Sequence, residues 1–404
     1  MFSATEPLAE YFPRKGDLMP GKNAPHVIYL DHNATTPIDP EVQARMRPYM
    51  DEAYGNPSSP YALGVRAREA VEQARAEVAG LIGCQPQEVI FTSGGSESNN
   101  TVLKGSVDFK NPQKYHIITS AIEHPAILNP ALFLMELGVR VTVVPVDGMG
   151  RVDPEEIRQA IRPETTLVSI MLANNETGTL QPIEEISRIT RAHGVRLHTD
   201  AAQAVGKIAV DVNGLGVDFL TIAGHKLYAP KGVGALYVRD GTSFTPLMHG
   251  GGQEFGKRAG TENVMFTTGL GTACRVVQKR LDRDIKEMTA LRERLKTYLF
   301  AHVDGLVLNG HSRYTLPNTL NVSVPHLKGG QILDGLPGLM ASTGAACHDQ
   351  SVTLSHVLSA MGVSPEIGMG ALRFSVGRSN TMDQMDVAAK WITDQIKRMR
   401  HGNP

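Results

Sequence analysis

The sequence predicts an α/β protein with a large domain built on a mainly parallel, seven-stranded sheet and a smaller α+β domain. From about Val27 to Arg275, short runs rich in β-branched residues alternate with helical stretches, which is the pattern of βαβ units. Some runs, such as Leu167–Leu172, are almost wholly apolar, as expected for strands buried on both faces. Beyond Arg275 this alternation ends.

The large domain is expected to span residues 27–275. Its predicted strands are Val89–Ser93, His116–Ser120, Val141–Pro145, Leu167–Leu172, Arg196–Thr199, Phe219–Ala223 and Gly234–Arg239. Helical patterns lie between them, among others at Gly64–Ile82, Glu155–Ile161 and Ile183–His193.

The small domain is expected to comprise residues 276–404 together with residues 1–26. It starts with a long helix rich in Lys, Arg and Glu, roughly Val276–Val303. Strand-like pieces follow at Thr319–Val324 and Leu372–Val376, and a terminal helix near Met385–Met399. We expect the segment Met1–His26 to pack on this domain or on a partner subunit.

The composition is that of a soluble globular protein. Of 404 residues, 41% are hydrophobic and 20% charged, and the formal net charge is −1. Such a balance predicts no binding to nucleic acid or to an anionic membrane and favours a small-molecule substrate. No apolar run is long enough to span a bilayer, and no secretory signal is recognisable.

The cysteines predict a reducing compartment. Cys84, Cys274 and Cys347 are too few and too scattered for a disulfide framework or a zinc site, so we expect no metal and a cytoplasmic location. Cys84 and Cys274 are interpreted as packing residues. Cys347 follows a run of small residues that indicates a mobile loop, where a thiolate could act as a nucleophile. An inert small residue is the alternative.

Polar clusters follow five of the predicted strands. They are Ser93–Glu97, Glu123–His124, Asn174–Glu176, Asp200–Gln203 and Gly224–Lys226. Ligands of open parallel sheets bind just beyond the carboxyl ends of the strands, so we expect these clusters to form one site.

Each candidate also has a structural alternative. Gly95 and Ser96 could present backbone N–H groups to a phosphate, or form a tight turn. Asp200 could pair with a protonated pyridine nitrogen, or cap a helix. Lys226 could form a Schiff base or be a solvated lysine, and His124 could stack on a flat cofactor or be structural.

Arg373 lies on an apolar predicted strand, where a buried guanidinium needs an anionic partner. A substrate carboxylate is the functional candidate and an internal salt bridge is the alternative.

Taken together, these motifs resemble class V aminotransferase-like enzymes of fold type I, specifically cysteine desulfurases and selenocysteine lyases. The resemblance runs from about Tyr29 to Ile396. The motifs that carry it are Tyr29–Pro37, Gly55–Ser59, Thr92–Asn100, Ala173–Gly178, His198–Gln203, Gly224–Lys226 and Arg258–Asn263.

The resemblance implies the cofactor pyridoxal 5'-phosphate and a homodimer with shared active sites. The implied cofactor-binding positions are Gly95, Ser96, His124, Asn175, Asp200, Gln203, His225, Lys226 and Thr261. Among them Lys226 is the implied Schiff-base lysine, Gln203 the partner of the phenolic oxygen, and Thr261 a contact to the other subunit's phosphate. Asn175, Arg373 and the nearby Asn33 are implied to hold the substrate carboxylate.

The implied reaction removes sulfur from L-cysteine, leaving L-alanine and a persulfide on Cys347 for an acceptor protein. Lys226, Cys347 and His124 are the implied catalytic residues, and L-selenocysteine is a second expected substrate. The sequence departs from some relatives at Ala223, where they have a phosphate-binding serine.

A dedicated selenocysteine lyase giving L-alanine and selenide stays open as the alternative, since Cys347-His348 resembles those lyases whereas His124-Pro125 resembles desulfurases. An aminotransferase that does not need Cys347, a cysteine hydrolase pairing Cys347 with His124, and a non-enzymatic sulfur carrier are further hypotheses.

Overall fold

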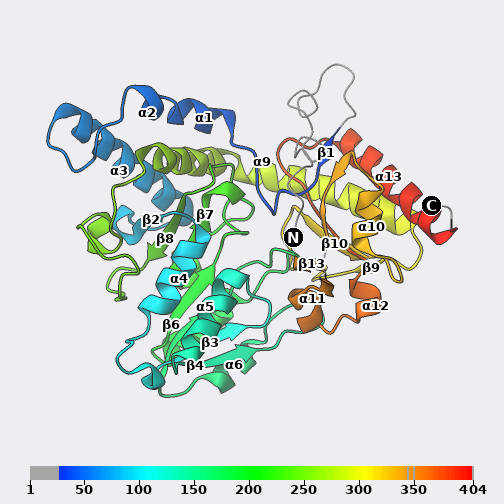
Figure 1. The fold of residues 1–404 in the computed structure, drawn as a ribbon, viewed down its shortest axis with the longest axis horizontal. Coiled ribbons are helices and arrows are strands. Elements are labelled where there is room, and N and C mark those ends of the chain that lie inside the picture. The colour runs from blue at the N-terminus through cyan, green and yellow to red at the C-terminus, as the bar shows by residue number, and fades with distance from the viewer. Residues whose placement is uncertain (1–26, 344, 349–350, 403–404) are drawn as a thin grey trace, which may run out of the picture.

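The computed structural model describes residues 27–343, 345–348 and 351–402, with backbone alone for residues 345–348 and 351–352. Its largest element is a seven-stranded sheet with the order β2-β8-β7-β6-β5-β3-β4 (Figure 1). The strands are β2 (Val89–Thr92), β3 (His116–Ser120), β4 (Arg140–Val144), β5 (Thr165–Ser169), β6 (Arg196–Asp200), β7 (Phe219–Ala223) and β8 (Gly234–Val238). Strands β3 to β7 pair in parallel and β8 is antiparallel to both neighbours, so the predicted mainly parallel sheet is confirmed.

Both faces of this sheet are covered. In β3, Ile117 belongs to the core shared with α4 (Gly95–Gly105) and α5 (Pro125–Glu136), whereas Ile118 belongs to the core on the opposite face. Successive strand residues point to opposite faces, which explains why β3 and β7 are buried along their whole length. The opposite face carries α3 (Ala62–Ile82), α6 (Pro154–Ala160), α7 (Ile183–Ala192) and the first part of α9 (Val264–His302). Shorter helices α1 (Pro40–Met46), α2 (Pro48–Asp51) and α8 (Val212–Leu215) lie in the connections.

Helix α9 begins at Val264 and not at Val276, so its predicted start is wrong. Its first turns contain threonines and glycines, which are poor helix formers. Tertiary packing overrides this weakness: a Cβ on Gly271 would lie 2.5 Å from the Cα of Ala74 in α3, so the glycine permits close contact between the two helices. The side chain of Asn263 caps the helix by accepting the N–H of Phe266. Figure 1 shows α9 running from the large sheet to the second part of the molecule.

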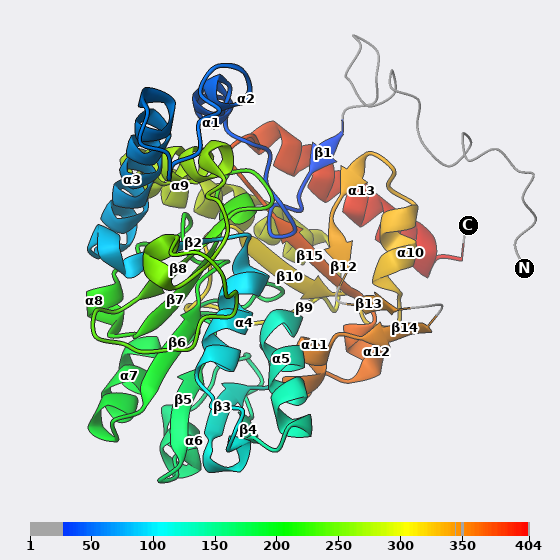
Figure 2. The same cartoon turned by 60° about the vertical axis from the view of Figure 1, so that its left-hand side comes forward.

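The second part is an α+β unit with its own core. Its sheet has the order β12-β15-β10-β9, formed by β9 (Val307–Leu308), β10 (Thr319–Ser323), β12 (Ser342–Thr343) and β15 (Ala371–Ser375). Helices α10 (Gly329–Asp334), α11 (His356–Ala360), α12 (Pro365–Gly368) and α13 (Met382–Arg400) accompany it (Figure 2). β1 (Ile28–Tyr29) pairs with β11 (Leu339–Met340), which places Ile28 and Leu30 in this core.

The division of the chain at residue 275 stays a prediction. That residue falls inside α9, whose residues Leu270 and Val277 pack in the core of the large sheet and whose residues Leu291 and Leu295 pack in the second core. The segment 1–26 lies outside the described residues. Within residues 27–343 and the other described stretches, no helix combines the length and apolarity needed to cross a membrane.

We expect the protein to lose stability as the pH falls below about 6.5. Burial lowers the pKa of His32, His116 and His225 to about 4, and that of His198 to about 3. Below about pH 6.5 the unfolded chain binds protons that the folded chain excludes, which costs about 1.4 kcal/mol per pH unit for each histidine. Burial raises the pKa of Glu123 to about 8. Folded Glu123 therefore keeps a proton that the unfolded chain has lost, and this offsets the destabilising effect of about one histidine.

The measurement is urea unfolding at about pH 7 and about pH 5. Unfolded histidines are only partly protonated at about pH 6.5, so for the four histidines less Glu123 the free energy of unfolding should fall with a mean slope of about two protons over this interval. A free energy that stays constant would show that these histidines are not held neutral by burial.

Candidate active site

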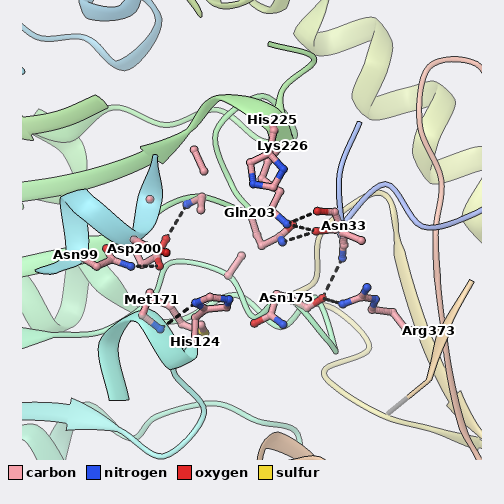
Figure 3. Close-up of a pocket in the computed structure, with 17 residues that line it drawn as sticks. Asn33, Asn99, His124, Met171, Asn175, Asp200, Gln203, His225, Lys226 and Arg373 are labelled. Carbon is pink, nitrogen blue, oxygen red and sulfur yellow. Dashed lines mark hydrogen bonds between the residues drawn. The ribbon is translucent and has the colours of Figure 1, made fainter. Parts of the chain in front are cut away.

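A cavity of about 320 Å³ lies at the carboxyl ends of the parallel strands (Figure 3). The predicted site residues that line it are Asn33, Gly95, Ser96, His124, Asn175, Asp200, Gln203, His225, Lys226 and Arg373. In Figure 3 Asn99 and Asp200 lie at one end, and Asn33 and Arg373 at the other. Five strand ends of the large sheet and β15 of the second sheet therefore converge on one space.

The start of α4 forms one wall of the cavity. Its N-cap Gly94 has φ 150°, a conformation that side-chain-bearing residues rarely adopt, and no side chain caps the helix. The neighbouring Glu97 accepts the N–H of Ser93 at 2.8 Å and pairs with Arg258 at 2.9 Å, which fixes the loop. Backbone N–H groups of Gly95 and Ser96 are therefore available to an anion at the positive end of the helix dipole.

Asp200, the last residue of β6, is held by two hydrogen bonds. Its Oδ2 accepts from Asn99 Nδ2 at 2.7 Å, and its Oδ1 accepts from the N–H of Ala202 at 2.9 Å. The side chain is only 7% exposed. A carboxylate fixed in this way can stabilise a positive charge in the cavity.

His124 both caps α5 and lines the cavity. Its Nδ1 accepts the N–H of Ala126 at 3.1 Å, so the neutral ring carries its proton on Nε2. Desolvation lowers the pKa of His124, and the Asp200 carboxylate opposes the shift. The ring is thus suited to receive and return a proton.

Lys226 follows β7 in a short helical turn and points into the cavity. Its Nζ donates to the carbonyl oxygens of Asn33 at 2.5 Å and Ala34 at 2.8 Å. Burial, with a contribution from Arg373, lowers the pKa of Lys226 to about 8, so a substantial fraction is neutral amine near physiological pH. Desolvation likewise lowers the pKa of the preceding His225 to about 4, and its Nδ1 lies 3.2 Å from Thr35 Oγ1.

Arg373 reaches the cavity from β15. Its guanidinium pairs with Asp31 at 2.7 Å, and donates to Ser342 Oγ at 2.9 Å and to the carbonyl oxygen of Asn175 at 3.0 Å. The internal salt bridge considered as the alternative is therefore present. Because the same side chain also lines the cavity, the pairing orients a guanidinium that a carboxylate could share.

Asn33 is fixed by its own hydrogen bonds. Its side-chain amide donates to Thr319 Oγ1 at 2.9 Å and to Asn175 O at 3.2 Å, and accepts from Asn318 at 3.0 Å. Direct binding of a substrate by this amide would require a change of partner. The backbone carbonyl oxygen of Asn33 accepts hydrogen bonds from Lys226 Nζ and from Gln203 Nε2.

Two predicted residues are not among those that line the cavity. Thr261 is exposed on the segment before α9. The phosphate that it was predicted to contact would have to lie in a second copy of the chain. Cys347 lies in β13 (Ala345–His348), which pairs with β14 (Ser351–Leu354), where the sequence predicted a loop. The side chain of Cys347 lies outside what the structure describes.

Besides Asp31, sequence reasoning missed two residues that support the cavity. Asn99 positions Asp200, and Lys207 donates to Gln203 Oε1 at 2.6 Å. Asn99 lies within one of the recognised motifs, so its amide could have been flagged. For Lys207 the only available signal was its place four residues after Gln203.

The donor set fits pyridoxal 5'-phosphate. The free N-terminus of α4 suits a phosphate, Asp200 a pyridinium, and the Lys226 amine an aldehyde. Apart from Met171, the remaining wall is made of small residues that leave room for a flat ring: Ala34, Ala126, Ala173, Ala202 and Ala223. At Ala223 a serine hydroxyl is absent, and the cavity offers Ser96 and His225 instead.

Comparison with known proteins agrees with this geometry. The Aminotransferase class-V family matches residues 28–387. The cysteine desulfurase IscS of Dictyoglomus turgidum is 44% identical over 93% of this chain and 96% of its own. A solved NifS-like protein superposes with a TM-score of 0.86 and 38% identity, covering 92% of this chain and 99% of the other. The structure of SspA in complex with cysteine has a TM-score of 0.77 and 35% identity, covering 87% and 99%.

The chain belongs to the class-V aminotransferase family, whose members are enzymes that depend on pyridoxal 5'-phosphate. Within that family it is similar to cysteine desulfurases of the IscS and NifS type. The predicted family and fold type I architecture are thereby confirmed.

Proposed function

We propose that this protein is a pyridoxal 5'-phosphate-dependent cysteine desulfurase that converts L-cysteine into L-alanine and a persulfide on Cys347. The observation that supports this most is the shared cavity of Lys226, Asp200 and Arg373. It combines a reactive amine, a fixed carboxylate and a guanidinium for the substrate carboxylate. The relatives favour cysteine over a dedicated selenocysteine lyase, because those compared with this chain are cysteine desulfurases.

Residues around the cavity would hold the cofactor. Gly95, Ser96 and His225 would bind its phosphate, Asp200 its pyridine nitrogen and Lys226 its aldehyde. When bound, pyridoxal 5'-phosphate supplies an electron sink for the bonding electrons released at the substrate α-carbon.

The chain's own groups would then move protons and sulfur. Arg373 orients the carboxylate, and the Lys226 amine takes the α-proton on Nζ. The Cys347 thiolate attacks the substrate sulfur, so that an S–S bond forms while the Cβ–S bond breaks. The electron pair of the broken Cβ–S bond stays with Cβ, which receives a proton that His124 Nε2 is suited to provide. Lys226 Nζ returns its proton to the α-carbon, and L-alanine leaves.

The assembly around this reaction is part of the proposal. Exposed Thr261 would reach the phosphate site of a second copy in a homodimer, and an acceptor protein would take the persulfide sulfur. Thiol chemistry of this kind suits the reducing cytoplasm predicted from the cysteine content.

The test is alanine release from L-cysteine and L-selenocysteine by purified protein supplied with cofactor. We expect a visible absorption band and turnover of L-cysteine, and we expect Cys347→Ala to lower that turnover about a hundredfold because it removes the nucleophile.

Cys84→Ala is the matched control. Burial raises the pKa of Cys84 to about 12, so this thiol is not a nucleophile near neutral pH and its loss should leave turnover unchanged. A protein that releases alanine only from selenocysteine, unaffected by Cys347→Ala, would instead be a selenocysteine lyase. A protein with no absorption band would contradict the proposal.

A further inference from the structure

Lys207 is a buried amine that the proposed reaction does not use. It is 4% exposed and lies in the turn that follows β6. The preceding Gly206 has φ 88°, and a Cβ there would lie 2.9 Å from the Cβ of Leu227. The left-handed glycine thus lets the Lys207 turn pack directly against the residue after Lys226. Burying an amine costs free energy unless the amine is hydrogen-bonded. The residue that Lys207 bonds to therefore indicates what the lysine does.

That partner is the amide of Gln203, which lines the cavity. Lys207 Nζ lies 2.6 Å from Gln203 Oε1, and Gln203 Nε2 donates to the carbonyl oxygen of Asn33 at 3.0 Å. The backbone carbonyl oxygen of Asn33 and the side-chain oxygen Oε1 of Gln203 can both only accept hydrogen bonds. The two contacts therefore set the orientation of the Gln203 amide from both sides.

We propose that Lys207 is a positioning residue that holds Gln203 as a hydrogen-bond donor toward the phenolic oxygen of the cofactor. The amide nitrogen has two N–H groups, and Asn33 takes one of them. The second is left for the cavity. A flipped amide would place its oxygen against the Asn33 carbonyl, which repels it. This inference rests on the proposed function, because it needs the cofactor in the cavity.

Burial and neighbouring charges act on the Lys207 amine in the same direction. Burial lowers its pKa well below the usual value, and the nearby cations Lys226 and Arg373 lower it further. An amine donates to an amide oxygen with or without its extra proton, so the contact with Gln203 Oε1 does not depend on the charge of Lys207.

The test is the pH titration of the visible band of the loaded protein. A donor to the phenolic oxygen stabilises its anionic form, so the proton that this oxygen shares with the lysine nitrogen is held less tightly. Lys207→Met keeps the apolar stem and removes the amine. We expect the titration midpoint to rise by about one pH unit, a tenfold change in proton affinity, while the thermal midpoint of the apoprotein stays close to wild type.

A double-mutant cycle separates positioning from a direct charge effect. Gln203→Leu should also raise the midpoint, and adding Lys207→Met to it should change nothing further. Lys279→Met, which removes an exposed lysine of α9, should leave the midpoint at the wild-type value.

An unchanged midpoint in Lys207→Met would overturn the inference and leave the proposed function intact. A shift that persists in the Gln203→Leu background would overturn it too, because Lys207 would then act without Gln203. If Lys207→Met does not fold, Lys207→Gln is measured under the same criteria, since its shorter amide does not reach Gln203. A wild-type protein without a visible band would overturn both the function and the inference.

Discussion

Lys226→Ala is expected to lower alanine release from L-cysteine by about 10⁴-fold or more, since it removes both the covalent anchor and the base. The structure supports this size of effect. The Nζ atom is directed into the cavity by two backbone carbonyls, at 2.5 and 2.8 Å, and burial brings its pKa to about 8. No other lysine lines the described cavity, so no second amine there can serve as the covalent anchor.

The measurement is the initial rate of alanine formation with cofactor in excess. Lys231→Ala, an exposed lysine in the loop that follows, is the control and should keep the wild-type rate. Retention of about a tenth of the rate by Lys226→Ala would show that another group is the base, and would require a different assignment of the cavity.

Asp200→Asn should lower kcat by about 10³-fold while changing KM for L-cysteine much less. The substitution keeps the shape of the side chain and removes its charge. The new amide oxygen can accept from the N–H of Ala202, and Asn99 can flip so that its unpartnered Oδ1 accepts from the new NH2 group, so the fold around β6 should persist. What is lost is the fixed negative charge that keeps the pyridine nitrogen of the cofactor protonated.

A matched control is Asp282→Asn, which neutralises an exposed carboxylate on α9. Both variants should bind cofactor and show a visible band. Equal kcat values for Asp200→Asn and wild type would mean that the carboxylate does not face the ring nitrogen.

Much of the fold was predictable because it follows from local patterns. β3 and β7 have the predicted bounds, since apolar runs flanked by turn residues mark strands of a two-sided sheet. The start of α9 was not predictable in this way. Its threonine- and glycine-containing first turns are helical because of contact with α3, which lies far away in the sequence.

The same distinction between local patterns and tertiary contacts applies to the candidate site. The strand ends that carry Asp200 and Lys226 could be recognised from sequence, because in a parallel sheet all carboxyl ends share one edge. The partners that orient the site side chains were not recognised: Asn99, which donates to Asp200, and Asp31, which pairs with Arg373, belong to other segments. The strand β13 at Cys347 was likewise predicted as a loop, since its run of small residues carries no strand signal of its own.

By itself, the sequence determined the α/β class, the mainly parallel sheet and the set of side chains at its edge. These properties depend on the spacing of apolar and polar residues along the chain, which can be read locally. Only the tertiary structure decided which of those side chains are paired. The ion pair of Arg373 with Asp31 and the hydrogen bond of Lys207 to Gln203 depend on how separate segments pack, on distances of a few ångströms and on burial. Residue spacing along a chain does not encode those quantities.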